Sequence, residues 1–269
     1  MKRQVEPVFP IYTVDAFAEA PFRGNPAGVC FLMGHQPDEW MQQLAQEMNL
    51  SETAFFMQKE GAYALRWFTP ATEVDLCGHA TLATAHIIWE SQLVGPEEEI
   101  FFETRSGILT AKRKDDWIEL NFPAKAPSPC DMPAGLAESL GIQPISSHRN
   151  EFDYLLECAT ADEVRNVKPD FKALSKVECR GVMVTAPSDL PDQDYICRFF
   201  APAVGVDEDP VTGSAHCCLA PYWSGKLGKM KLRGYQASER GGIVETELLG
   251  DRVLLRGKAI TVVQGVFTA

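Results

Sequence analysis

The chain has 269 residues, of which 45% are hydrophobic and 23% are charged, a balance typical of a globular protein and not of a disordered one. The formal net charge of −12 excludes the basic surface that nucleic acid requires, so an anionic ligand would have to be held by local groups. No apolar run approaches the ~20 residues of a membrane-spanning helix, and no membrane partner is expected.

The eight cysteines form no C-x-x-C pair and have irregular spacing, which predicts reduced thiols in a cytoplasmic protein. The first seven residues are too polar for a signal peptide. No phosphate-binding loop, dinucleotide fingerprint or G-x-S-x-G motif is present, so neither a nucleotide cofactor nor a serine hydrolase is indicated.

The first half of the chain is predicted to be rich in strands. One helix is expected from about residue 37 to residue 49, and a second, free of charged residues, at 80–89. In the predicted strand at 51–57, both alternating faces carry apolar residues, and Glu52 shares its face with Ala54 and Phe56. The other strands are expected at 8–17, 29–33, 63–68, 100–103, 107–112 and 117–121.

A cluster of prolines at 123–133 separates two predicted halves. We expect an N-terminal half at 1–123, a linker at 124–133 and a C-terminal half at 134–256, and the strand at about 257–269 is a candidate for completing the first half. Strands outnumber helices in both halves, so an α+β fold is favoured over a doubly wound α/β fold. The later strands are expected at 152–158, 181–186, 195–200, 231–236, 242–247, 252–256 and 259–265, with helical turns at 161–174.

One loop and helix occur twice. The segments FTPATEVD at 68–75 and FAPAVGVD at 200–207 share Phe, Pro, Ala, Val and Asp at matching places. Gly78 and Gly213 then open two charge-free helices, with three more residues before the second one. A helix without a polar face must be enclosed. The repeat therefore predicts two related halves, each a curled sheet wrapped around a central helix whose start opens towards the other half.

The two helix starts are candidate anion sites. Unpaired N–H groups and the positive end of the helix dipole, at Gly78-His79 and at Gly213-Ser214, would bind a small carboxylate. The alternative is that the two glycines only allow tight turns from strand to helix.

Three polar residues near these turns are candidates for chemistry. Apolar surroundings would raise the pKa of Glu52 into the range of a general acid–base, although a structural glutamate fits the pattern as well. His79 would lie near a bound ligand or be structural, and Asp209 is also typical of a turn or helix N-cap. No Cys/His cluster of metal-ligand spacing surrounds His79, so no metal is expected. Cys77 and Cys217 do not hold equivalent places beside the two turns, which disfavours a thiol-pair mechanism.

Five motifs together resemble the PhzF (phenazine biosynthesis-like) family and are spread over essentially the whole chain. They are RGNPAG at 23–28, NLSET at 49–53, DLCGHAT at 75–81, EDPVTGSA at 208–215 and Q-x-S-x-R-G-G at 236–242. The resemblance implies the diaminopimelate epimerase-like fold, with two pseudo-symmetric halves that are each a curled, mostly antiparallel sheet or open barrel around a central helix. It also implies a cleft between the halves that works without metal or organic cofactor, and a homodimer. It assigns catalysis to Glu52, His79 and Asp209, and substrate binding to a further set: Gly78, Gly213, Ser214, Asn25, Arg240 and Gly241.

The function that follows is a cofactor-independent isomerase of a small carboxylate. Glu52 would remove a proton from an activated carbon and return it at another, with Asp209 and His79 positioning the substrate. Two alternatives stay open at this point: an amino-acid or hydroxy-acid racemase or epimerase, and a non-catalytic binding module with the same fold.

Overall fold

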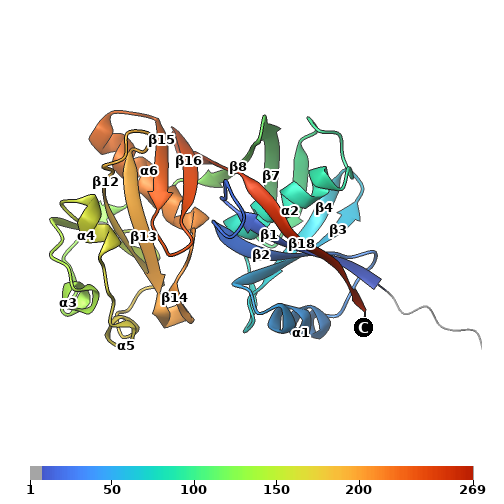
Figure 1. The fold of residues 1–269 in the computed structure, drawn as a ribbon, viewed down its shortest axis with the longest axis horizontal. Helices are drawn as coiled ribbons and strands as arrows, with labels where there is room; N and C mark the ends of the chain where they lie inside the picture. Colours follow the sequence, from blue (N-terminus) through green and yellow to red (C-terminus); the bar gives the residue numbers. More distant parts are fainter. Residues whose placement is uncertain (1–7, 269) are drawn as a thin grey trace, which may run out of the picture. The chain divides into compact units, whose positions relative to one another are not determined.

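The computed structural model describes residues 8–268, so the signal-peptide prediction for the first seven residues lies outside the described part. Contacts between Cα atoms divide the chain into two compact units (Figure 1). Unit 1 consists of the described residues up to Phe22, the segment Pro26–Leu120 and the residues from Lys258 onward. Unit 2 consists of Arg23–Asn25 and Asn121–Gly257, so the proline-rich residues 124–133 belong to it.

Unit 1 is built on one mixed sheet in the order β18-β1-β2-β3-β4-β6-β7-β8. The pairs β2–β3 and β4–β6 are parallel, whereas β1–β18, β3–β4, β6–β7 and β7–β8 are antiparallel. The strands are β1 (Val8–Ala16), β2 (Asn25–Phe31), β3 (Glu52–Lys59), β4 (Ala62–Phe68), β6 (Ile100–Thr104), β7 (Gly107–Lys114), β8 (Trp117–Pro123) and β18 (Ala259–Thr268), and the short β5 (Glu73–Val74) pairs with β4.

Two helices cover opposite faces of this sheet. Helix α1 (Asp38–Met48) buries Met41, Leu44 and Ala45 against a cluster that includes Phe55. Helix α2 (Gly78–Glu90) is buried nearly all round, as the absence of charge at 80–89 predicts, and it contacts β1, β3 and β18. Successive side chains of a strand point to opposite faces, so Glu52, Ala54 and Phe56 lie on the face away from α1.

Unit 2 repeats this arrangement in the order β9-β10-β11-β12-β13-β15-β16-β17. The pairs β11–β12 and β13–β15 are parallel, at the places that β2–β3 and β4–β6 hold in unit 1, and β14 adds to β13 as β5 adds to β4. The strands are β9 (Ser128–Pro129), β10 (Ser146–Arg149), β11 (Asp153–Glu157), β12 (Gly181–Pro187), β13 (Tyr195–Ala201), β14 (Val206–Glu208), β15 (Lys231–Gln236), β16 (Gly242–Leu249) and β17 (Arg252–Gly257).

The sheet of unit 2 is also covered on both faces. Helix α6 (Gly213–Leu227) packs Ala215, Leu219 and Trp223 against one face, which includes Met183. The other face carries Val182 and Val184 and is covered by three short helices, α3 (Leu136–Leu140), α4 (Ala161–Arg165) and α5 (Phe171–Leu174). A 3₁₀ turn at Pro202–Val204 precedes β14. The α+β class, with mixed sheets and few helices, is confirmed.

Among the described residues, no helix has the length and apolar character needed to cross a membrane.

Candidate active site

Glu52 opens β3 on the face turned away from α1, next to Ala27 of the parallel strand β2. Its side chain is 20% exposed. Burial raises the pKa of the Glu52 carboxyl above its usual value, and hydrogen bonds from Ser51 and Cys77 counteract part of that rise. A partly desolvated carboxylate of this kind is suited to accept and return a proton.

His79 and Cys77 lie against this carboxylate from the start of α2. The His79 Nε2 atom is 3.2 Å from the Glu52 Oε2 atom and 3.3 Å from the Ser51 hydroxyl oxygen. On the other side of the ring, Nδ1 is 3.5 Å from the Cys77 Sγ atom. We call Glu52, Cys77 and His79 the Glu–Cys–His cluster.

The sequence did not predict this grouping of residues, and the expectation that no metal is bound stays a prediction. Spacing alone showed no group of metal-ligand residues around His79, whereas in the structure one ligand atom from each cluster residue lies within 4.8 Å of the others. Cys77 and His79 are two positions apart, but Glu52 comes from a different element. The sequence alone does not place Glu52 beside the start of α2.

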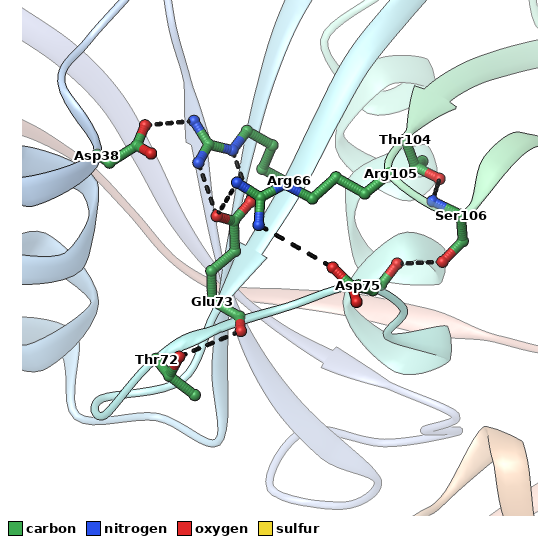
Figure 2. A network of polar contacts seen from close by, with 8 residues as sticks. All are labelled: Asp38, Arg66, Thr72, Glu73, Asp75, Thr104, Arg105 and Ser106. Carbon is green, nitrogen blue, oxygen red and sulfur yellow. Dashed lines mark hydrogen bonds and ion pairs between the residues drawn. The ribbon is translucent and has the colours of Figure 1, made fainter.

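A polar network holds the loop that leads into α2 (Figure 2). Arg66 on β4 donates two hydrogen bonds to the Glu73 carboxylate, each 2.7 Å long. Arg105 forms an ion pair with the same carboxylate at 2.7 Å, and the Ser106 hydroxyl donates to the backbone oxygen of Asp75 at 2.6 Å. The turn between β6 and β7 therefore fixes the residues immediately before Cys77.

The first turn of α2 keeps the features of an anion site. Its N-cap residue, Cys77, makes no side-chain capping hydrogen bond, and the first turn contains no acidic residue. The Thr81 hydroxyl donates to the Cys77 carbonyl at 2.5 Å. The Cys77 carbonyl therefore has a hydrogen-bond partner within the helix. Gly78 has no side chain, so a ligand can approach the backbone N–H groups of this turn.

Asp209 lies in unit 2, directly after β14. Its Oδ1 atom accepts a hydrogen bond from the Asn25 side-chain amide at 2.7 Å, and its Oδ2 atom accepts one from the Thr212 hydroxyl at 2.6 Å. The N-cap residue of α6 is Thr212, so the expectation that Asp209 itself caps this helix is wrong. The carboxylate is instead held in place by two donors.

Gln236, at the end of β15, orders the same segment, although the sequence predicts no separate role for it within the Q-x-S-x-R-G-G motif. Its Oε1 atom accepts from the Thr212 N–H at 2.9 Å, and its Nε2 atom donates to the backbone oxygen of Asp209 at 2.7 Å. Behind it, complete burial lowers the pKa of His216 to about 3, so that this histidine is neutral and bonds to the Tyr195 hydroxyl at 2.7 Å.

Arg240 and Gly241 hold the loop that ends at Asn25. The Arg240 Nε atom donates to the Gly24 carbonyl at 2.9 Å, and the Gly24 N–H donates to the Gly241 carbonyl at 2.7 Å. Gly241 has a φ of +65°, which suits glycine. These contacts are to the protein backbone, and substrate binding by Asn25, Arg240 and Gly241 stays a prediction.

Gly213 and Ser214 begin α6 as Gly78 and His79 begin α2. Thr212, the N-cap residue, makes no side-chain capping hydrogen bond, and the first turn again contains no acidic residue. The structure thus brings Glu52, Gly78 and His79 together in unit 1. The remaining predicted residues lie in unit 2: Asn25, Asp209, Gly213, Ser214, Arg240 and Gly241.

Comparison with known proteins gives consistent matches along the chain. The PhzC–PhzF family model, described as phenazine biosynthesis-like protein, matches residues 14–265. A protein of Halalkalibacterium halodurans named as an uncharacterized isomerase is 53% identical over 95% of this chain and 97% of its own length. The crystal structure of a PhzF-family protein from Enterococcus faecalis superposes with a TM-score of 0.94 at 39% identity, covering 98% of this chain and 100% of that one.

A more distant neighbour shares the fold alone. The crystal structure of a hydroxyproline epimerase from Agrobacterium vitis superposes with a TM-score of 0.63 at 12% identity, over 97% of this chain and 92% of that one.

Proposed function

Since the chain belongs to the phenazine biosynthesis-like PhzC–PhzF family and is an isomerase, we propose that it moves a proton within a small carboxylic acid, with Glu52 as the acid–base group. The proposal rests on one observation above all. The Glu52 carboxyl is largely desolvated, its pKa is raised, and its Oε2 atom is 3.2 Å from the His79 Nε2 atom at the start of a buried helix.

The proposed reaction conserves all atoms of the substrate. The Glu52 carboxylate takes a proton from a carbon next to an unsaturated or carboxylate group, and the electron pair of the broken C–H bond delocalises into that group. The same carboxyl then returns the proton to another carbon, and the double bond moves. His79 orients the carboxylate and stabilises the charge that develops, and no external acceptor of electrons is needed.

The substrate carboxylate would be held by backbone N–H groups at helix starts. Gly78 supports this role in unit 1, and Gly213 and Ser214 support it in unit 2, because neither helix has a side-chain cap or an acidic first turn. Asp209, fixed by Asn25 and Thr212, is the proposed substrate-positioning group of unit 2. Catalysis without a cofactor, a homodimer and a cytoplasmic location are further parts of this proposal.

Solvent exchange tests the assignment of Glu52. A panel of small unsaturated and cyclic carboxylic acids is incubated with the protein in deuterated buffer, and deuterium uptake is followed by NMR. We expect Glu52→Gln to lower the exchange rate by about 10²–10⁴-fold, the usual contribution of a general acid–base. Glu60→Gln is the matched control, because Glu60 is exposed just after β3. Full exchange by Glu52→Gln would refute the assignment.

Epimerisation is a second candidate, and a different observation favours it. The Cys77 thiol lies against both Glu52 and His79, so the site contains a second group able to carry a proton. Epimerisation would use a second group to deliver a proton to the face of the carbon opposite the one from which the first group removes it. Chiral chromatography of the exchanged product separates the two reactions, since only epimerisation inverts a stereocentre.

A further inference from the structure

The Glu–Cys–His cluster contains three different kinds of metal ligand. Thiolate sulfur, imidazole nitrogen and carboxylate oxygen are the donors that Zn²⁺ takes in proteins, and sites with three protein ligands leave a fourth position open. Here one such atom from each residue lies within 4.8 Å of the other two.

The donors lie within 4.8 Å of one another, and a tetrahedral ion would draw them closer together. Metal–ligand bonds of about 2.0–2.3 Å place neighbouring donor atoms roughly 3.3–3.7 Å apart. The His79 Nε2 atom is 3.2 Å from Glu52 Oε2, and the His79 Nδ1 atom is 3.5 Å from Cys77 Sγ. Only one imidazole nitrogen can bind the ion, so the donor on the other side of the ring has to move by about 1 Å, within reach of a side-chain rotation.

Charge also favours a divalent cation once the ligands lose their protons. A Cys77 thiolate and a Glu52 carboxylate together neutralise a 2+ ion, whereas the apo site holds the Glu52 charge in largely apolar surroundings. The positive end of the α2 dipole opposes a cation, but two full negative charges in direct contact exceed the half charge of a helix terminus.

We propose that the Glu–Cys–His cluster binds one Zn²⁺ ion through Glu52, Cys77 and His79, and that the ion inhibits the enzyme. Binding releases the Cys77 proton and any proton on Glu52, and His79 binds as neutral imidazole. The consequence for activity rests on the proposed role of Glu52, because a carboxylate that ligates zinc cannot take a substrate proton. Because binding releases protons from the ligands, the affinity for Zn²⁺ rises with pH.

Cobalt(II) reports binding without any substrate. The reduced full-length protein, freed of metal with a chelator, is titrated with Co²⁺, and absorbance detects thiolate-to-cobalt charge transfer and the ligand-field bands of a tetrahedral site. We expect one equivalent per chain, displaced by Zn²⁺. Cys77→Ser should abolish the charge-transfer band and weaken binding at least tenfold, whereas Cys130→Ser, a half-buried thiol of unit 2, should change neither.

The cobalt titration tests the metal site independently of the proposed role of Glu52 in catalysis. Absence of stoichiometric Co²⁺ binding, or a charge-transfer band that persists in Cys77→Ser, would overturn it. Thermal unfolding with and without Zn²⁺ shows whether each variant is folded, and only proteins that bind the ion should gain stability. If Glu52→Gln kept full exchange activity while the wild type still bound Co²⁺ through Cys77, the metal site would stand and the catalytic assignment would fall.

Discussion

The two units carry the same arginine–glutamate clamp, and its contribution to stability can be worked out from the structure. Arg198 on β13 holds Glu208 with two hydrogen bonds of 2.7 and 2.8 Å, as Arg66 on β4 holds Glu73. The two arginines also lie over phenylalanine rings, Arg198 over Phe200 at 4.8 Å and Arg66 over Phe68 at 5.1 Å. We therefore choose the pair in unit 2 for a double-mutant cycle with Arg198→Met and Glu208→Gln.

Burial sets the expected magnitude. The Arg198 and Glu208 side chains are 12% and 20% exposed, and hydrogen bonds between charged groups contribute about 1.5–3 kcal/mol. Exposed pairs contribute only about 0.2–1 kcal/mol. We expect a coupling free energy of about 2 kcal/mol. Arg198→Met alone should cost more, because Arg198 also donates to the Val167 carbonyl at 2.8 Å, but that contact cancels in the cycle.

Urea unfolding of the four proteins measures this coupling. The matched control is the pair Lys59–Glu103, whose side chains are both 44% exposed and whose coupling should stay below about 1 kcal/mol. A coupling free energy in the Arg198–Glu208 cycle no larger than that of the control would refute the argument. It would mean that neither burial nor the paired hydrogen bonds strengthen this ion pair.

Two further predictions concern stability. Burial raises the pKa of Glu52 in the folded protein above its ordinary value of 4.5, so the folded state binds the proton more tightly and the wild type loses stability as pH rises from 4.5 through the folded pKa. At neutral pH, Glu52→Gln should therefore unfold at a higher urea concentration than the wild type, and this difference should disappear below pH 4.5. A difference that does not depend on pH would contradict the argument from burial. Gly234→Ala would place a Cβ atom 2.4 Å from the ring of the fully buried Tyr195 and should cost about 1–3 kcal/mol. In Gly225→Ala, within α6, the added Cβ atom meets nothing within 4 Å, so this substitution should instead raise the free energy of unfolding by about 0.5–1 kcal/mol. Unfolding temperatures that shift in the same direction in both variants would contradict this prediction.

Much of the fold could be predicted because its two halves repeat. The shared residues at 68–75 and 200–207 and the charge-free helices after Gly78 and Gly213 predict two related sheets, each with a buried helix. The arginine of the clamp follows from the same comparison, since Arg66 and Arg198 each lie two residues before the phenylalanine that begins the repeat, but Glu73 and Glu208 do not hold matching places in it. The ion pairs themselves cannot be predicted from the arginines, because the sequence does not show that β5 and β14 fold back beside β4 and β13.

The site was harder to predict because its contacts join residues far apart in the chain, and some of its elements are too short to show a pattern. The sequence disfavours a thiol-pair mechanism because Cys77 and Cys217 do not hold equivalent places. The contacts of Cys77 with Glu52 and His79 depend on how α2 packs on β3, which the sequence does not give. Gln236 acts through its two amide atoms on a segment more than twenty residues away. Helix α3 has five residues, too few to show a helical period.

The pairing of β1 with β18 has a consequence for how the molecule is made. Val8 lies opposite Thr268, so unit 1 needs both the earliest and the latest described segments, whereas nearly all of unit 2 is one uninterrupted stretch. On the ribosome, unit 2 can complete its sheet while the first 120 residues still lack an outer strand. The half that carries Glu52 would then mature last, only after β18 has left the exit tunnel.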